Sequence, residues 1–255
     1  MSIHKSAIVH PEAEIGEGVV IGPFSVIGKV KIGEGTRVAS NVVIEDGADI
    51  GKECHIAPGV LIGGPPQHVH IRDVNSFVKI GDQNVIREYV TIHRSLYEGR
   101  STQIGDRNFL MAYAHVAHDC LIGNDVVLTS YTGLSGHVVV ENRAVISGFV
   151  GIHQFVRIGA LAIVGGGAVV TQDILPFVMA TGNPAKVHGL NSVGLRRYNI
   201  SPKVRSDLKK AFKLLYRSNL NTTQALSRIR EEVEMSEEIE QLIHFVESSK
   251  RGICK

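Results

Sequence analysis

The chain has 255 residues, a formal net charge of +2 and 44% hydrophobic residues, which suffices for one large domain or two ordinary ones with a buried core. The small net charge argues against a nucleic-acid partner, and three cysteines without CxxC spacing argue against a disulfide framework or a structural zinc site. The amino terminus lacks a basic flank followed by an apolar core, and no stretch reaches the roughly 18 apolar residues of a membrane span. We therefore expect a cytoplasmic protein without stable membrane insertion.

Aliphatic residues recur at every sixth position from the amino terminus onward, with a slip of one residue between Ile27 and Ile32. An amphipathic helix repeats about every 3.6 residues and a strand about every 2, so this period predicts another geometry. In a triangular coil, three short strands complete a turn and one aliphatic side chain per hexad points inward, so residues 1–188 are predicted to form one parallel β-helix. The repeat comprises Ile3, Val9, Ile15, Ile21 and Ile27; Ile32, Val38, Ile44, Ile50, Ile56 and Ile62; Ile80, Ile86 and Ile92; and Ile104, Leu110, Val116, Ile122, Leu128, Leu134, Val140, Ile146, Ile152, Ile158, Val164 and Val170.

Two segments interrupt the repeat without losing its phase, residues 64–77 and 95–102. Both carry charged residues where hexads would carry aliphatic ones, so they are predicted to be loops outside the coil. Binding residues on a solenoid usually lie in such loops. An insertion that the coil merely tolerates would have the same sequence signature.

Four histidines cluster in the second half of the repeat, and the length of one coil decides whether they meet. A coil of three hexads has 18 residues, so Gly136 follows His118 by one coil and Gln154 follows it by two. These three residues should therefore stack in one column, about 4.8 Å apart per step. His137 and His153 flank this column, and His115 is the fourth histidine of the cluster.

The column carries groups suited to the attack of a hydroxyl on a thioester. His118 is the candidate general base, because the pKa of histidine lies close to neutral pH. Gly136 lacks a side chain, so its backbone N–H can reach an oxyanion. Asp119 can orient the imidazole only if the chain turns a corner there, since adjacent residues on a straight strand point to opposite faces. The alternative is a row of ordinary surface histidines.

Beyond Pro184 the hexads stop and helical spacing begins. Ser201-Pro202 is typical of an N-cap followed by proline in the first helical turn. Residues 203–217 place apolar side chains on one face, and residues 222–247 predict at least one further amphipathic helix. We therefore expect a helical domain at 189–255 that covers the open end of the coil.

Four segments are more specific than the hexads: NFLMAYAHVAHDC, GLSGHV, VGIHQFVRIGA and GNPAKVHGLNSVGLRR. They resemble the UDP-N-acetylglucosamine acyltransferases that open lipid A synthesis, and the similarity covers nearly the whole chain. The resemblance implies a left-handed coil, which spacing alone does not reveal, and a homotrimer with active sites between adjacent subunits. It also implies transfer of an acyl chain from acyl carrier protein to the 3-position of UDP-N-acetylglucosamine, with no cofactor besides that thioester.

The same resemblance assigns roles to individual residues. It makes His118 the base and Gly136 the oxyanion donor. Gly166 matches the position at which the family sets acyl length, and glycine there implies a longer, 3-hydroxylated chain. The substrate-binding residues that it implies are Gln67, His115, His137, His153 and Gln154, with Asn191 and Arg197 at the nucleotide end.

The chain departs from the family pattern at four positions. The family's first loop reads close to PQDLKY, whereas this chain reads PPQHVHIR and places His68 and His70 where an aspartate and a lysine are expected. We keep both histidines as substrate-binding candidates. Val193 stands where an acidic residue for the uracil is expected, and Tyr198 where an arginine is expected. These changes leave open a related branch that acylates a 3-amino sugar nucleotide and forms an amide.

The segment 203–217 carries six basic residues and the single acid Asp207. Acyl carrier proteins are acidic, so a basic helix face would steer and orient such a partner. Lys209, Lys213 and Arg217 repeat every four residues and share one side of the predicted helix. We expect these three to dock the carrier protein, and the alternative is an ordinary solvated face.

Two other functions fit the same scaffold. A trimeric zinc carbonic anhydrase also builds its site from histidines, and His115 and His118 have HxxH spacing. Neutral histidines can bind a sugar without a metal, so no metal is expected here. A non-enzymatic β-helix that binds a surface would need a regular row of threonines along one face, but the threonines of this chain are sporadic.

Overall fold

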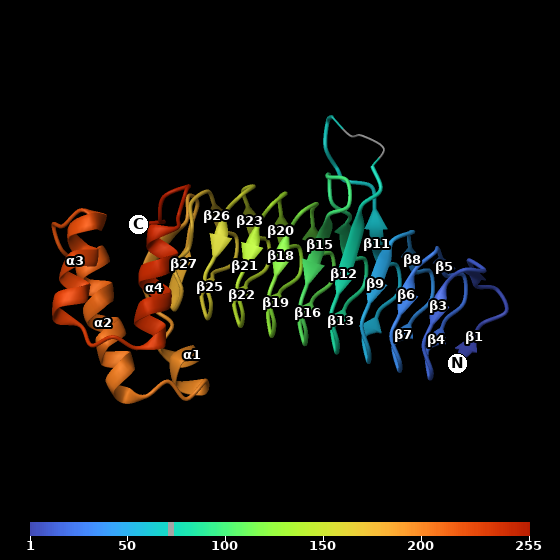
Figure 1. Cartoon of the computed structure of the whole chain (residues 1–255), viewed down its shortest axis with the longest axis horizontal. Coiled ribbons are helices and arrows are strands. Elements are labelled where there is room, and N and C mark those ends of the chain that lie inside the picture. The colour runs from blue at the N-terminus through green and yellow to red at the C-terminus, as the bar shows by residue number, and fades with distance from the viewer. Residues whose placement is uncertain (71–73) are drawn as a thin grey trace.

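The structure is a computed structural model that describes residues 1–70 and 74–255, so residues 71–73 of the loop predicted at 64–77 lie outside the described residues. It consists of an elongated stack of coils with a group of helices at the carboxyl-terminal end (Figure 1). The coils form a left-handed parallel β-helix, as the resemblance implied.

Every third strand belongs to the same sheet, which is the arrangement expected of a triangular coil. The first sheet contains β1 (Ser2–Ile3), β4 (Val20–Ile21), β7 (Arg37–Val38), β10 (His55–Ile56), β13 (Val85–Ile86), β16 (Phe109–Leu110), β19 (Val127–Leu128), β22 (Val145–Ile146), β25 (Ile163–Val164), β27 (Val178–Thr181) and β28 (Lys186–Leu190). The second contains β2 (Ile8–Val9), β5 (Val26–Ile27), β8 (Val43–Ile44), β11 (Leu61–Gly64), β14 (Thr91–His93), β17 (His115–Val116), β20 (Gly133–Leu134), β23 (Gly151–Ile152) and β26 (Val169–Val170). The third contains β3 (Glu14–Ile15), β6 (Lys31–Ile32), β9 (Ala48–Ile50), β12 (Phe77–Ile80), β15 (Ser101–Ile104), β18 (Leu121–Ile122), β21 (Val139–Val140) and β24 (Arg157–Ile158).

The predicted hexad residues form the core. Val116 pairs with Leu134, which pairs with Ile152, so successive coils are in register at intervals of one turn. All three are at most 1% exposed. At the open amino-terminal end, Ile3 occupies the same kind of position but is 38% exposed, because no coil lies beneath it.

Each corner of the coil uses one residue in the left-handed region of backbone space. Tyr113, Asp119 and Asp125 have φ values of 62°, 61° and 57°, and they mark the three corners of a single coil. A non-glycine residue in this region carries a conformational penalty, which the stacked coils on either side must offset. This turn redirects the side chains on its two sides, so neighbours in sequence can face each other there.

Both predicted loops leave the coil at the same corner. The first lies between β11 and β12 and the second between β14 and β15, and each joins a strand of the second sheet to a strand of the third. The corner at 117–119 joins the same two sheets in the next coil, between β17 and β18. The loops therefore emerge one and two coils before the histidine column and along the same edge.

The helical region follows the antiparallel pair β27 and β28, so the boundary predicted at 188/189 falls inside β28. The helices are α1 (Ser192–Arg197), α2 (Pro202–Tyr216), α3 (Thr222–Glu232) and α4 (Glu237–Glu247). Ser201 caps α2 as predicted, with its hydroxyl accepting from the N–H of Val204. Arg157 of the last full coil stacks over Phe245 of α4 at 4.1 Å and donates to Ser248 at 2.8 Å, so α4 covers the end of the coil. No helix in the described ranges is both long and apolar enough to cross a bilayer.

Candidate active site

The structure brings the predicted column together at the corner that both loops overhang. The backbone N–H of His137 donates to the carbonyl of His118 at 3.0 Å, and that of Phe155 donates to the carbonyl of Gly136 at 3.1 Å. Consecutive corners are thus stacked by hydrogen bonds between coils. We call residues 117–119, 135–137 and 153–155 the base corner.

Asp119 and His118 form a pair because of the turn at this corner. With φ at 61°, Asp119 folds back beside the preceding imidazole, and its Oδ2 lies 2.8 Å from His118 Nδ1. The Ser95 hydroxyl and the Leu96 N–H also donate to this carboxylate. Burial raises the pKa of Asp119, but the hydrogen bonds from His118, Ser95 and Leu96 outweigh it and hold the pKa below its ordinary value. The carboxylate is therefore ionised, and Nδ1 of His118 carries a proton.

Gly136 lies directly against the other edge of the His118 ring. A Cβ atom at this position would lie 2.6 Å from Nε2 and 2.5 Å from Cε1, so no other residue fits without moving the imidazole. Among the described residues, none accepts a hydrogen bond from the Gly136 N–H. This N–H can therefore donate to a ligand beside Nε2.

His115 lies on the second-sheet side of the same groove as a neutral group. Its Nδ1 lies 2.8 Å from the Thr91 hydroxyl, and its ring lies 5.2 Å from that of His93. Burial, followed by the charge of His93, lowers the pKa of His115 to about 4. His93 is buried in turn and holds the carbonyl of Pro65 at 2.7 Å, so it fixes the start of the first loop. A neutral imidazole can both donate to and accept from a sugar hydroxyl.

The opposite side of the base is closed by aromatic rings. His137 packs edge-on against His118 at 5.2 Å and stacks on Phe155 at 4.5 Å. Burial lowers the pKa of His137, although the nearby Asp119 opposes the shift. From the first loop, His68 packs edge-on against His118 at 5.8 Å.

A groove of about 630 Å³ runs along the outer face of the second sheet up to the base. Gly133 and Gly151 form its floor, and a Cβ at either would meet no atom within 4 Å. The missing side chains therefore create room for a ligand next to His115. The predicted residues that line this groove are Gln67, His68, His115, His118, Gly136, His153 and Gln154.

Three predicted substrate residues lie elsewhere in the same chain. Gly166 occupies the corner between the first and second sheets, which is a different edge of the coil. Arg197 is exposed at the end of α1. Asn191 caps α1 by accepting from the N–H of Gly194, and it donates to the carbonyl of Leu161, so both ends of its buried amide already have partners.

His70, Val193 and Tyr198 lie outside this groove. His70 does not line the groove, but its ring lies 5.9 Å from that of His68 within the first loop. Val193 is half exposed on α1, and the ring of Tyr198 lies under the Arg143 guanidinium at 4.6 Å. Tyr198 thus holds the end of α1 against a coil corner.

The predicted basic stripe lies on the solvent side of α2. Lys209, Lys213 and Arg217 are all exposed, and within the described residues none of them is paired with an acid. Their neighbours differ, because Lys203 pairs with Glu234 and Lys210 with Asp207. The stripe therefore keeps its positive charge unneutralised.

The three groups His118, Asp119 and His137 place ligand atoms within 4.8 Å of one another and could hold a divalent cation. Both oxygens of Asp119 already accept hydrogen bonds from Ser95, Leu96 and His118. A metal would have to replace these donors. The geometry favours a hydrogen-bonded base over a metal centre.

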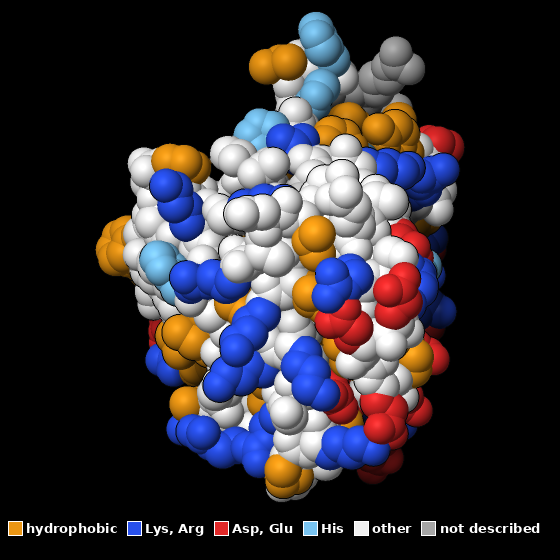
Figure 2. All heavy atoms as spheres, turned by 90° about the vertical axis from the view of Figure 1, so that its left-hand side faces the viewer, with side chains coloured by type: hydrophobic (Ala, Val, Ile, Leu, Met, Phe, Trp, Pro, Cys, Tyr) orange, Lys and Arg blue, Asp and Glu red, His pale blue; other side chains and the backbone are white. Residues whose placement is uncertain are grey.

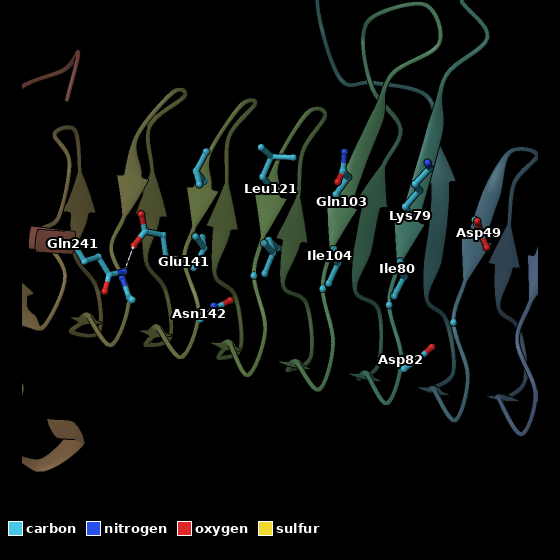
Figure 3. Close-up of a pocket in the computed structure, with 18 residues that line it drawn as sticks. Asp49, Lys79, Ile80, Asp82, Gln103, Ile104, Leu121, Glu141, Asn142 and Gln241 are labelled. Atoms are coloured by element: carbon cyan, nitrogen blue, oxygen red, sulfur yellow. Dashed lines mark hydrogen bonds between the residues drawn. The ribbon is translucent and has the colours of Figure 1, made fainter. Parts of the chain in front are cut away.

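A second groove, of about 640 Å³, lies on the outer face of the third sheet beside α4 (Figure 3). Asp49, Lys79 and Leu121 project from different coils along it, and at its end Gln241 donates to Glu141 at 3.2 Å. The described residues that line it include no histidine. It therefore lacks a group that could serve as a base near neutral pH.

Several residues in or around the base corner escaped the sequence prediction. His93, Ser95 and Tyr97 belong to the last strand before the second loop or to the loop itself, where the hexad pattern gives no guide. Phe155 lies one coil beyond His137, so the same arithmetic that stacked His118 on Gly136 could have found it.

The chain is similar to known proteins over its whole length. Residues 173–254 match the family model "Udp N-acetylglucosamine O-acyltransferase; Domain 2", and residues 29–64 and 101–136 match the bacterial transferase hexapeptide repeat. A protein of Thermodesulfovibrio yellowstonii named acyl-[acyl-carrier-protein]--UDP-N-acetylglucosamine O-acyltransferase is 51% identical over 99% of both chains. One of the same name from Syntrophobacter fumaroxidans is 48% identical over 100% of both. The crystal structure of a UDP-N-acetylglucosamine acyltransferase from Bacteroides fragilis aligns with a TM-score of 0.96, at 40% identity and over 99% of both chains.

Proposed function

Because this chain belongs to the family of UDP-N-acetylglucosamine O-acyltransferases, we propose that it transfers a 3-hydroxylated fatty acyl chain from acyl carrier protein to the 3-hydroxyl of UDP-N-acetylglucosamine, the first step of lipid A synthesis. The observation that carries the mechanism is the His118–Asp119 pair at 2.8 Å with Gly136 against the free edge of the imidazole. The names of the full-length relatives support an ester product over the amide of the 3-amino branch.

In this mechanism, Asp119 holds the proton on Nδ1 of His118 and leaves Nε2 free to accept one. Nε2 takes the proton of the sugar hydroxyl as its oxygen attacks the thioester carbon. The carbonyl oxygen becomes an oxyanion, and the N–H of Gly136 donates to it. When the C–S bond breaks, His118 returns the proton to the departing thiol of the carrier. The reaction needs no cofactor besides the carrier thioester.

His115 and the other polar residues of the groove would bind the sugar rather than its charged diphosphate. The low pKa of His115 keeps it uncharged at neutral pH, so it offers a hydrogen bond without attracting phosphate. Gln67, His68, His153 and Gln154 line the same groove and complete the sugar site. His70, Asn191 and Arg197 lie outside this groove and remain candidates for the nucleotide end.

A homotrimer would join residues that one chain keeps apart. His118 and Gly166 lie on different edges of the β-helix and in different coils, so a site that contains both needs a second copy. The corner of Gly166 also exposes an aromatic stack, whose rings lie 4.9 to 5.1 Å apart. We call this edge the aromatic corner; it consists of Tyr89, Tyr113, Tyr131 and Phe149. Exposed apolar stripes of this kind are typical of interfaces, which supports packing of this corner against a neighbouring subunit.

The basic stripe of α2 would receive the carrier protein. Seen from the carboxyl-terminal end, Lys and Arg side chains gather over the helical region (Figure 2). Lys209, Lys213 and Arg217 are exposed on α2 and are not neutralised by acids among the described residues. An acidic carrier would be steered to this face and oriented by it.

The test is to incubate the protein with UDP-N-acetylglucosamine or its 3-amino analogue and a series of acyl carrier protein thioesters, and to identify products by mass. We expect an ester of UDP-N-acetylglucosamine. His118→Ala should reduce turnover by about 10²- to 10⁴-fold without changing the melting temperature. An amide product, or a folded His118→Ala protein with unchanged turnover, would overturn the proposal.

A further inference from the structure

Ser95 occupies an unusual place for a loop residue, because it is fully buried between the second loop and the base corner. Its hydroxyl donates to Oδ1 of Asp119, while its Oγ accepts from the N–H of Tyr97 at 3.0 Å. The loop thus returns to the coil, where the Ser95 hydroxyl donates a hydrogen bond to the carboxylate that orients the base. The Leu96 N–H donates to Oδ2, at 3.1 Å.

We propose that Ser95 is a positioning residue for the reaction, which extends the His118–Asp119 pair into a chain of three hydrogen-bonded side chains. This inference rests on the proposed role of His118 as the base. Nothing in the hexad repeat places a serine here, because residues 95–102 lie outside the coil. The second loop therefore has a function in the mechanism.

The carboxylate needs such partners to act on the imidazole in one fixed orientation. Asp119 reaches His118 with Oδ2 only, so rotation about its side chain would break the pair. Ser95 holds Oδ1, the opposite oxygen, which fixes the plane of the carboxylate. Hydrogen bonds that lock a second group in this way tune and orient the group that does the chemistry.

The loop itself is anchored by a separate hydrogen bond. The Ser76 hydroxyl, at the end of the first loop, donates to the backbone carbonyl of Ser95 at 2.6 Å. Ser76 is only 3% exposed, and among the hydrogen bonds of the described residues none joins it to Asp119. The chain therefore offers a matched control, in which a buried serine of the same junction loses its hydroxyl while the donor to Asp119 remains.

The base is surrounded by few titratable groups. Asp119 faces His118 from the same corner, His137 from the next coil, His68 from the first loop, and His93 from the strand before the second loop. Without the hydrogen bond from Ser95, the negative charge of the Asp119 carboxylate is less stabilised. It therefore interacts more strongly with protonated His118. The acidic limb of the pH profile should then move to higher pH.

The experiment measures kcat, the two KM values and the pH profile of Ser95→Ala, Ser95→Thr and Ser76→Ala in the intact protein. We expect Ser95→Ala to lower kcat by about tenfold, with both KM values nearly unchanged and the acidic limb of kcat/KM shifted to higher pH. Ser95→Thr, which keeps a hydroxyl, should restore much of the rate. Ser76→Ala should change the melting temperature as much as Ser95→Ala does but leave the pH profile at its wild-type position.

A double-mutant cycle tests whether Ser95 acts on the rate through Asp119. In an Asp119→Asn background, Ser95→Ala should cost little further rate, because its partner is already changed. If Ser95→Ala has wild-type kcat and pH profile while His118→Ala is inactive, the role of Ser95 is refuted and the base stands. If His118→Ala is fully active, the proposed function itself fails. Equal losses in Ser95→Ala and Ser76→Ala, with no shift of the profile, would reduce Ser95 to a loop anchor.

Discussion

The base corner and the aromatic corner repeat the same backbone turn in the same coils, but they hold different side chains. The turn residue has φ of 61° at both Asp119 and His137 and 62° at both Tyr113 and Tyr131. At the aromatic corner, like rings stack on like. At the base corner, each step along the column changes the chemistry from carboxylate to imidazole to the phenyl ring of Phe155.

The two corners also differ in what covers them. Both inserted loops leave the β-helix along the same edge as the base corner, and the second returns Ser95 and Leu96 to Asp119. The aromatic corner has no insertion in the described coils, and Phe149 is 71% exposed. The backbone repeat thus supplies evenly spaced positions, while chemistry arises where the column is irregular and a loop closes over it.

The sharpest test of this comparison adds the same methyl group at equivalent positions of the two corners. Gly136 precedes His137 as Gly148 precedes Phe149, but a Cβ at Gly136 would lie 2.6 Å from His118 Nε2, whereas at Gly148 the nearest atom is the carbonyl oxygen of Ser130 at 3.1 Å. Gly136→Ala should lower kcat by about 10²- to 10³-fold, because it displaces the base and the oxyanion donor. Gly148→Ala should stay within a few-fold of wild type. Steady-state kinetics on folded variants decide the matter, and equal effects would remove the distinction between the corners.

The sequence predicted the regular part of this contrast and missed the irregular part. Counting coils from His118 placed Gly136 and Gln154 correctly, because the turn length is constant wherever hexads continue. It did not reveal Ser95, since a loop residue is located by its contacts rather than by the period. Phase counting does show that both loops leave from one corner. The helix α1 also went unpredicted, as six residues carry too little periodicity.

A second test asks whether His115, in the groove beside the base corner, is buried as a neutral group. The pKa of His115 is lowered to about 4 by burial, so the unfolded chain binds a proton at this residue between about pH 6.5 and about pH 4 while the folded chain does not. His115 therefore favours folding above pH 6.5, and this stability is lost as pH falls through that window, by on the order of 3 kcal/mol at most. The midpoint of urea unfolding should fall less for His115→Gln than for wild type between pH 7 and pH 4.5. Identical pH dependence in both proteins would show that His115 is not buried in its neutral form.

A third test separates the base corner from the surface that recruits the donor. Lys209, Lys213 and Arg217 lie on α2, outside the groove, so reversing all three to glutamate should leave the chemistry of His118 intact. The KM for acyl carrier protein thioester should rise about tenfold, the KM for the sugar nucleotide should stay unchanged, and added salt should affect the variant less than wild type. Lys203 and Lys210, which are paired with Glu234 and Asp207, provide the matched control. If the stripe variant and the Lys203/Lys210 control changed both KM values equally, the stripe would be an ordinary solvated face.

The smallest expected effect concerns the edge of the aromatic corner, where Gly166 lies one coil after Gly148, the residue that precedes Phe149. A Cβ at Gly166 would meet the carbonyl oxygen of Gly148 at 3.5 Å, an ordinary contact, so Gly166→Met should fold and place its side chain into the space beside Phe149. If the acyl chain of a donor bound to the neighbouring subunit ends there, a long donor loses contact worth about one methylene, ~0.8 kcal/mol or roughly fourfold in kcat/KM. Donors several carbons shorter should be unaffected, so the preferred length shifts downward. Competition between long and short thioesters measures this ratio directly, with Gly166→Ala as the control for the backbone. An unchanged ratio in Gly166→Met would separate the aromatic corner from the acyl chain altogether and leave it as a contact between subunits.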